Sequence, residues 1–192
     1  SFRRIRVHIR EGSVVGGGKH PVSMSVATTN LADRVTNPVQ RAFSKIKDGI
    51  GLAECGAIFP ASMGVVSGLD PRNNNEPFVN HLFLMVTGGA AAAKTDSWLT
   101  ILHAGNSGMC FVDSIELDEL HFPILVKTRK LVPDSEGAGR TIGSPSGYCE
   151  YSPIGGGDIE VAYVSDGAIN TAKGTLGGLH GAASKNYLLK KN

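Results

Sequence analysis

Cysteine is scarce in this chain of 192 residues, and the spacing of its cysteines matches neither a metal site nor a disulfide scaffold. The three cysteines, Cys55, Cys110 and Cys149, lie far apart and form no CxxC pair. A disulfide framework or a cysteine zinc site is therefore not expected, and a reducing cytoplasm fits the chain best.

Two further classes of partner are disfavoured by what the sequence lacks. The formal net charge is only +2 and aromatic residues make up 6%, so there is no basic, aromatic-rich surface for nucleic acid. There is no secretory leader pattern and no apolar run of about 18 residues, because Thr87-Gly88-Gly89 interrupts the longest apolar stretch. We expect a soluble protein without a membrane partner.

The remaining composition is that of a globular protein. Hydrophobic residues make up 41% and charged residues 19%, which is typical of a folded rather than a disordered chain. At this length we expect a single domain, residues 1–192, with a strand–loop–helix portion at 1–55 and a β-rich portion at 56–192.

The helical signal lies in the first 55 residues. Residues 5–9 alternate apolar and polar side chains, which predicts a strand, and the glycine-rich stretch 12–21 predicts a loop. Apolar residues then recur at spacings of three and four over residues 31–46, which predicts an amphipathic helix of about 16–18 residues. Pro38 either kinks this helix or, with Asn37 as its cap, starts a second one.

Short β-rich runs alternate with turn residues in the rest of the chain. Clusters of Gly, Asn, Asp or Pro separate the runs, which predicts strands joined by turns. The fold class we predict is α+β, with one long amphipathic helix layer followed by a mostly antiparallel β-sheet or sandwich. The predicted strands are residues 79–86, 98–103, 123–131, 147–151 and 158–164.

Two polar or glycine-rich stretches are candidate sites. Gly88-Gly89, followed by four alanines, permits close approach of a ligand, although a flexible hairpin connection explains it equally well. It does not have the spacing of a phosphate-binding P-loop. His103, Asn106 and Ser107 could orient a carbonyl or transfer a proton, but on local sequence alone a polar turn is the stronger interpretation.

No metal site is predicted. Residues 116–121 carry three acids and a histidine, but neighbouring residues of a strand point to opposite faces, so a solvated acidic bend before Pro123 is favoured. The histidines show no HxH, HExxH or HxxxH spacing. None of the serines lies in a GxSxG turn, which disfavours a serine hydrolase.

Residues 133–140, Pro-Asp-Ser-Glu-Gly-Ala-Gly-Arg, form the most informative segment. Pro133 suits the end of the strand before it, Gly137 and Gly139 allow a tight turn, and Arg140 can face an anion. Most loops of this kind are structural.

The same segment resembles the PDSGGAGR signature of the hydantoinase B/oxoprolinase family, with Glu136 in place of a glycine. Other segments resemble blocks of that family in the same order, so the similarity extends from about Ile5 to about Gly181. They are Pro60 to Gly64, Asp70-Pro71-Arg72, Glu76 to Val79, Gly88-Gly89, His103 to Met109, Asp113 to Glu116, Tyr148 to Tyr151, Ser165-Asp166-Gly167 and Gly177-Gly178.

The resemblance implies a component of a cytoplasmic, multi-subunit, ATP-dependent amidohydrolase of the hydantoinase and oxoprolinase type. In that chemistry ATP phosphorylates the amide or enol oxygen of a small-molecule substrate, and water attacks the activated intermediate. A hydantoinase A-like partner subunit is expected to bind ATP. A polypeptide carrying the N-terminal region of the B-type subunit, which nothing in this chain resembles, is expected to supply a divalent metal.

Several expectations about this chain follow from the same resemblance. It corresponds to the C-terminal third of such a subunit, encoded separately, cleaved or only partly represented, and alone it is expected to be inactive and to bind neither ATP nor metal. In the complex it lines the substrate cavity and the subunit interface. His103 and Asn106 are the catalytic candidates. Gly88, Gly89 and Arg140 are the substrate-binding candidates, with Arg140 as an anion-binding or structural clamp.

Two other functions fit the sequence. One is a subunit of an ATP-dependent ketone carboxylase of the acetone or acetophenone type. It is favoured by two departures from the commoner hydantoinase pattern, which are Glu136 and residues 113–120 in place of an Asn-Thr-Pro-x-Glu segment. The other is a non-catalytic assembly domain, because the chain carries no recognisable metal, nucleotide or nucleophile motif. Bicarbonate consumption separates carboxylation from hydrolysis.

Overall fold

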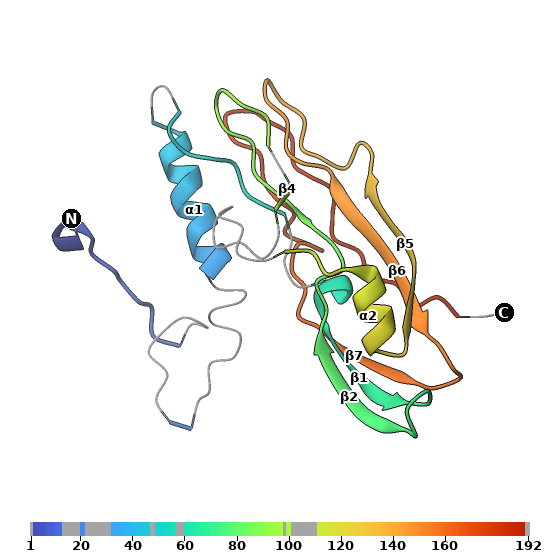
Figure 1. Cartoon of the computed structure of the whole chain (residues 1–192). Helices are drawn as coiled ribbons and strands as arrows, with labels where there is room; N and C mark the ends of the chain where they lie inside the picture. The colour runs from blue at the N-terminus through green and yellow to red at the C-terminus, as the bar shows by residue number, and fades with distance from the viewer. Residues whose placement is uncertain are drawn as a thin grey trace.

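The computed structural model describes residues 2–12, 20–21, 32–46, 49–56, 60–97, 99–100 and 111–190 (Figure 1). All of the described strand pairs are antiparallel, in the orders β2-β1-β7, β3-β4 and β5-β6, so the predicted mixed class with antiparallel sheets is confirmed. In chain order the elements are a 3-10 turn Phe2–Arg4, α1 Ala32–Ser44, a 3-10 turn Ala61–Met63, β1 Val65–Asp70, β2 Glu76–His81, β3 Thr87–Gly88, β4 Leu99–Thr100, α2 Ile115–His121, β5 Ile124–Val132, β6 Ser146–Pro153 and β7 Ile159–Ala162.

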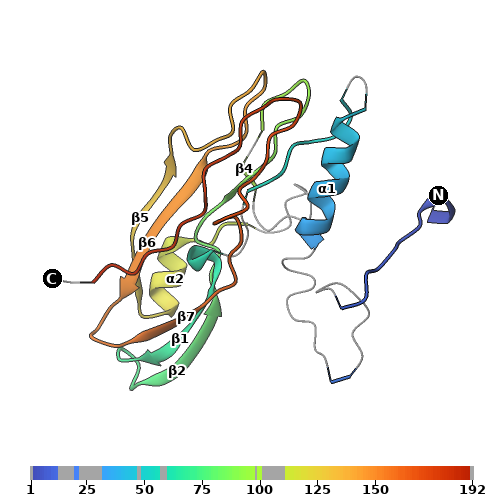
Figure 2. The same cartoon turned by 180° about the vertical axis from the view of Figure 1, so that it is seen from behind.

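The hydrophobic core joins the β2-β1-β7 sheet to the β5-β6 pair. Val66 of β1 and Ile124 of β5 are fully buried, together with Leu82 and Leu84 from the segment after β2. α2 packs next to β5, as both views show (Figures 1 and 2). Partly buried side chains from the strands complete the cluster, among them Phe78, Val126, Cys149, Tyr151, Ile159 and Val161.

The predicted strand at residues 79–86 is not one strand. After β2, Leu82 and Leu84 donate their backbone amides to the carbonyls of Gly64 and Ser62, at 2.9 and 3.0 Å. The apolar run is therefore buried, but its backbone bonds to the segment just before β1 rather than to a strand ladder.

The predicted strand at residues 5–9 is wrong. These residues belong to no strand, and their side chains are exposed. Both views show residues 2–12 as an extended segment apart from the sheets (Figures 1 and 2). An alternating pattern selects the extended conformation but does not provide a pairing partner. Most of the predicted loop at 12–21, and all but Leu99–Thr100 of the predicted strand at 98–103, lie outside the described residues.

α1 corrects the prediction of a long amphipathic helix layer. It has 13 residues with Pro38 inside it, and its apolar side faces away from the sheets. Val35, Val39 and Phe43 are 57%, 49% and 47% exposed, whereas the side chain of Asn37 is buried. The periodicity was real, but it does not reveal which side of a helix packs inward.

Polar contacts attach α1 to the rest of the chain. They link the helix to the segment 54–55 and to Asp166, so the buried side of α1 is its polar side. The contacts are Arg34 Nε to Asp166 Oδ2 at 3.0 Å, Arg41 Nη1 to Glu54 Oε1 at 2.9 Å, and the Cys55 amide to Asn37 Oδ1 at 3.3 Å.

α2 replaces the predicted acidic bend. Ser114 caps the helix, because its hydroxyl accepts a hydrogen bond from the Leu117 amide at 3.3 Å. Glu116 lies in the first turn, where a negative charge is favourable. A helix of 7 residues is too short for its periodicity to be recognised in the sequence. Neither described α-helix is long and apolar enough to cross a bilayer.

Because of Asp118 in α2, we expect an unusual pH dependence of the folding stability of the chain. Its side chain is 6% exposed. Burial first, and then the nearby Asp113 carboxylate, raise its pKa from 3.8 to about 6. The folded state therefore favours the neutral acid, and the stability that Asp118 contributes is complete below pH 3.8 and is lost as the pH rises through about 6.

We expect Asp118→Asn to match the wild type in free energy of unfolding near pH 4 and to exceed it by about 2–3 kcal/mol at pH 7.5. Urea unfolding followed by circular dichroism across this pH range measures the difference. Glu116→Gln is the control with the opposite sign, because hydrogen bonds lower the pKa of the exposed Glu116. A gap for Asp118→Asn that does not change with pH would contradict the assignment.

Candidate functional site

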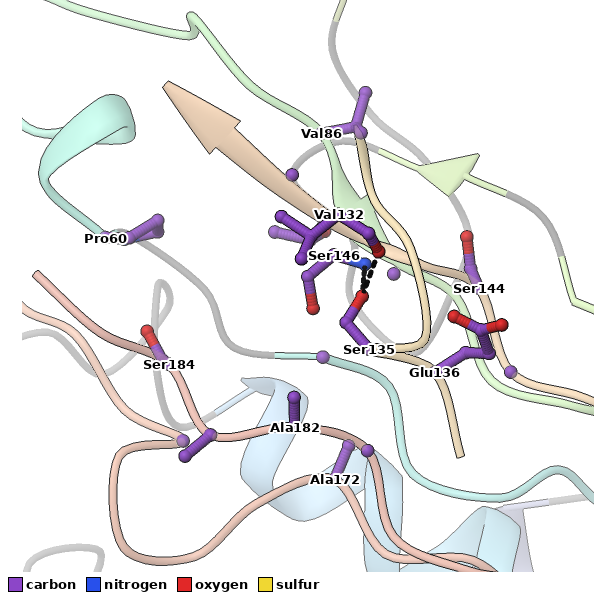
Figure 3. A pocket seen from close by; sticks show the side chains of 18 of the residues that line it. Pro60, Val86, Val132, Ser135, Glu136, Ser144, Ser146, Ala172, Ala182 and Ser184 are labelled. Carbon is purple, nitrogen blue, oxygen red and sulfur yellow. Dashed lines mark hydrogen bonds between the residues drawn. The ribbon is translucent and has the colours of Figure 1, made fainter. Parts of the chain in front are cut away.

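A cavity of about 1580 Å³ lies where several loops meet β6. Its walls come from the stretches 85–93, 135–144, 146–153 and 172–189. The first stretch contains the Gly88-Gly89 pair, and the second contains Ser135 to Arg140 of the Pro133–Arg140 segment. The structure therefore brings both predicted loops to one cavity. The view in Figure 3 looks into it.

Ser135 holds the Pro133–Arg140 segment against the neighbouring strands. Its hydroxyl donates to the Val132 carbonyl at 2.6 Å and accepts from the Ser146 amide at 2.7 Å, as the dashed lines in Figure 3 mark. The side chain is buried, so both bonds are shielded from water. Its proton is already engaged with a carbonyl, which agrees with a structural role and not a nucleophilic one.

The C-terminal segment forms the opposite side of this loop. The Leu179 amide donates to the Ala138 carbonyl at 2.8 Å, and the Ala182 amide donates to the Ser135 carbonyl at 2.9 Å. At Gly137 a Cβ atom would lie 2.5 Å from the Leu179 carbonyl oxygen. A glycine is therefore required there for the two segments to approach each other.

Gly88 and Gly89 also pack closely against their neighbours at the cavity wall. The Gly88 carbonyl accepts from the Gly56 amide at 2.8 Å, and the Gly89 carbonyl accepts from the Ser144 amide at 3.4 Å. A Cβ atom on Gly88 would lie 3.0 Å from the Ser144 carbonyl oxygen. These close contacts explain why glycines, which have no side chain, stand at positions 88 and 89. The substrate-binding role of the pair stays a prediction.

Arg140 joins its loop to the alanine-rich stretch. Its Nη2 donates to the Ala93 carbonyl at 2.8 Å, and the neighbouring Thr141 hydroxyl donates to the Ala92 carbonyl at 2.6 Å. Of the two roles predicted for Arg140, these contacts fit the structural clamp. Anion binding by the same side chain, which borders the cavity, stays a prediction.

The remaining predicted residues lie outside the part of the chain that the structure describes. His103 and Asn106 fall in the stretch 101–110, so their catalytic role stays a prediction. Among the described residues, no group of three or more His, Cys, Asp or Glu side chains is placed to hold a metal ion.

Two side chains of β6 at the cavity wall are neutral at physiological pH. Burial raises the pKa of the Cys149 thiol to about 11 and that of the Tyr151 hydroxyl to about 12. Tyr151 donates its proton to the Ala61 carbonyl at 2.8 Å. Cys149 is therefore an inert thiol at the cavity wall, since reactivity requires the thiolate.

Two glutamates of the cavity differ in how they are bonded. Glu150 contacts Lys127 Nζ at 3.4 Å and accepts from the Tyr148 hydroxyl at 3.2 Å. One carboxylate oxygen of Glu136 is buried and has no hydrogen-bond partner among the described residues. The hydroxyl oxygen of Ser144 is likewise buried and has no partner among them. We did not predict Glu136 or Ser144 as site residues. The available signal was the departure of Glu136 from the glycine of the PDSGGAGR signature.

The model of the hydantoinase B/oxoprolinase family matches residues 1–192. The chain belongs to the hydantoinase B/oxoprolinase family. Among curated proteins, the beta subunit of caprolactamase from Pseudomonas jessenii is 27% identical over 154 residues. The match covers 80% of this chain and 26% of the relative, so the chain spans about a quarter of the length of this hydantoinase B relative.

Proposed function

We propose that the chain is a component of a multi-subunit, ATP-dependent enzyme that opens a cyclic amide, and that it contributes part of the wall of the substrate cavity. The observation that supports this proposal most strongly is the family match over the whole chain. The cavity adds to it, because residues 88–89 and 135–140 of the family-like loops border it. The relative is named for caprolactam, a seven-membered cyclic amide, and is a subunit of its enzyme.

ATP and a divalent metal are assigned to partner polypeptides. The described residues of this chain offer no metal-ligand cluster, and the sequence has no P-loop spacing. When bound to its partner, ATP would supply the phosphoryl group that makes the amide carbon electrophilic enough for water to add and for the ring C–N bond to break. The residues of this chain would hold the ring in a largely apolar cavity, away from competing water.

The test is purification of the complex from its source, with native mass spectrometry of all chains that purify with it. We expect a large ATP-binding chain and a chain that carries the metal-site region. We also expect ATP hydrolysis to rise at least about tenfold on addition of caprolactam or hydantoin, with ring-opened acid as product. The chain alone should turn over neither substrate.

Each result of this test has a defined meaning. ATP consumption that needs bicarbonate and a ketone would show that the complex carboxylates a ketone and does not hydrolyse a cyclic amide. A chain that is found alone in its source, or ATP hydrolysis that no cyclic amide stimulates, would contradict the proposal.

The outward apolar side of α1 favours an additional assembly role. Val35, Val39 and Phe43 lie four residues apart and are each about half exposed, while the polar side of the helix contacts the rest of the chain. A continuous apolar stripe of this kind is a common partner-binding surface. Mass spectrometry shows whether the chain assembles with partners, and the ATP hydrolysis assay shows whether the assembled complex is active.

A further inference from the structure

We propose that residues 5–9 are one strand of an intermolecular β-sheet, added to the exposed sheet edge of the polypeptide that carries the larger part of the hydantoinase B-type subunit. That edge has one apolar face and one acidic face. The inference rests on the multi-subunit complex of the proposed function and names one of its contacts. It explains why residues 5–9 have the pattern of a strand and yet belong to no described strand of their own chain.

The first argument is an exposed apolar row. Ile5, Val7 and Ile9 alternate with polar residues, and they are 65%, 77% and 60% exposed. In an extended chain alternate side chains point to the same side, so these three form one row. Single apolar residues on a surface need no explanation, whereas a row of β-branched side chains is typical of a strand that packs against another body.

The second argument is the backbone of the same segment. Both views show it extended and apart from the sheets, and no hydrogen bond joins residues 5–9 to another described residue (Figures 1 and 2). The segment contains neither glycine nor proline, so each of its residues can donate an amide proton to a ladder. Such an unpaired strand can be added to the edge of a partner's sheet.

The third argument is the charge that the partner must carry. Arg6 and Arg10 lie on the side of the segment opposite the apolar row, together with His8. Opposite charges on directly neighbouring strands stabilise a sheet, and like charges destabilise it. The strand next to residues 5–9 is therefore expected to present acidic residues on this side.

The free sheet edges of this chain suit the segment poorly. The described strand β5 is basic, since it carries Lys127, Arg129 and Lys130. β2 contains Pro77, which has no amide proton to donate, and β7 is only 4 residues long. A second copy of the chain therefore does not offer a well-matched edge among its described strands.

The larger part of a B-type subunit is the occupant that the comparison favours. The match to the caprolactamase beta subunit covers 26% of that protein, so about three quarters of such a subunit lies outside the match. Both views also show residues 2–12 on the far side of α1 from the sheets, the side to which α1 turns its exposed apolar residues (Figures 1 and 2). One large partner can cover both surfaces.

The experiment measures hydrogen–deuterium exchange of residues 5–9 by mass spectrometry, in the purified complex and in the isolated chain. In the isolated chain these amides should exchange as in an unstructured peptide. In the complex, exchange of two or three of them should be at least about 100-fold slower, because an edge strand bonds through every second residue. A photo-crosslinking amino acid in place of Val7 should attach to the larger B-type polypeptide.

Substitutions separate the ladder from the charge. Neighbouring amides of a strand point to opposite edges, so one of Val7→Pro and His8→Pro should weaken partner binding at least about tenfold, and the other clearly less. Val7→Ile keeps the amide and the apolar row and should bind as the wild type does. Arg6→Glu should weaken binding about tenfold at low salt and less at high salt, whereas Arg6→Lys should retain it.

The stability of the isolated chain is the control for all of these variants. Its free energy of unfolding should not change, because residues 5–9 are exposed and no hydrogen bond holds them to the other described residues. A loss of stability would show that the segment supports its own fold, which contradicts the inference.

The failure of this inference can be told from failure of the proposed function. Equal exchange of residues 5–9 in the complex and in the isolated chain overturns it, and so does slow exchange in the isolated monomer. Slow exchange that appears as the isolated chain dimerises overturns the assigned partner in favour of a second copy. ATP-dependent lactam hydrolysis with unprotected residues 5–9 leaves the proposed function standing alone. Protection in a complex that no cyclic amide stimulates supports the added strand and rejects the hydrolase.

Discussion

Gly174→Ala is expected to lower the free energy of unfolding of the chain by about 3 kcal/mol or more. The Cβ atom of an alanine at position 174 would collide with the carbonyl oxygens of Gly178 and Leu179, the second at a distance of 2.5 Å. Both obstacles are backbone atoms, so no side-chain rotation relieves the overlap. Urea unfolding followed by circular dichroism measures the loss.

The matched control for this substitution is Gly143→Ala, in the loop on the other side of the cavity. There the nearest atom to the new Cβ is the Gly137 amide nitrogen at 3.4 Å, an ordinary contact. Stability should be unchanged or raised by up to about 1 kcal/mol, because alanine restricts the unfolded chain. Equal effects of the two substitutions would show that the close approach of position 174 to the Gly178 and Leu179 carbonyls is not the cause.

Leu84→Ala should cost about 3 kcal/mol of folding free energy through a different mechanism. Leu84 is fully buried in the cluster with Val66 and Ile124, which joins the β2-β1-β7 sheet to β5. Its truncation leaves a cavity that rigid strands on both sides cannot close. The loss is measured by urea unfolding in the same way.

Leu69→Ala provides the same chemical change on the outer face of β1. Leu69 is 54% exposed, so its removal should cost less than about 1 kcal/mol. Equal losses of stability for Leu69→Ala and Leu84→Ala would contradict the assignment of Leu84 to the core and of Leu69 to the surface.

The strands that the sequence predicts best are those rich in β-branched and aromatic residues. Residues 123–131 and 147–151 read as β-branched or aromatic runs, and they form the β5-β6 pair. β1 was missed, because Gly68 in its centre and Pro71 at its end read as turn residues. Its Gly68 is needed for packing, since a Cβ there would lie 2.8 Å from the Asp158 carbonyl oxygen.

The site was predictable in its loops and not in its individual contacts. The Pro133–Arg140 segment and the Gly88-Gly89 pair meet at the cavity, as their glycine content and family resemblance suggested. The wall stretch at residues 172–189 has no regular secondary structure, so no periodicity marks it in the sequence. The hydrogen bond from Arg140 to the Ala93 carbonyl joins residues far apart in the sequence, so local patterns could not predict it.

The close packing of main chain around the cavity limits where side chains can be added to its wall. Gly137 and Gly174 both abut the Leu179 carbonyl, so neither position can acquire a side chain without displacing the backbone. Gly143 has ordinary room, and its neighbours Glu136 and Ser144 already project side chains at the wall. A new side chain at the cavity wall is therefore accommodated at position 143, or by replacing the side chains at positions 136 and 144, whereas an addition at position 137 or 174 has to displace the main chain at Leu179.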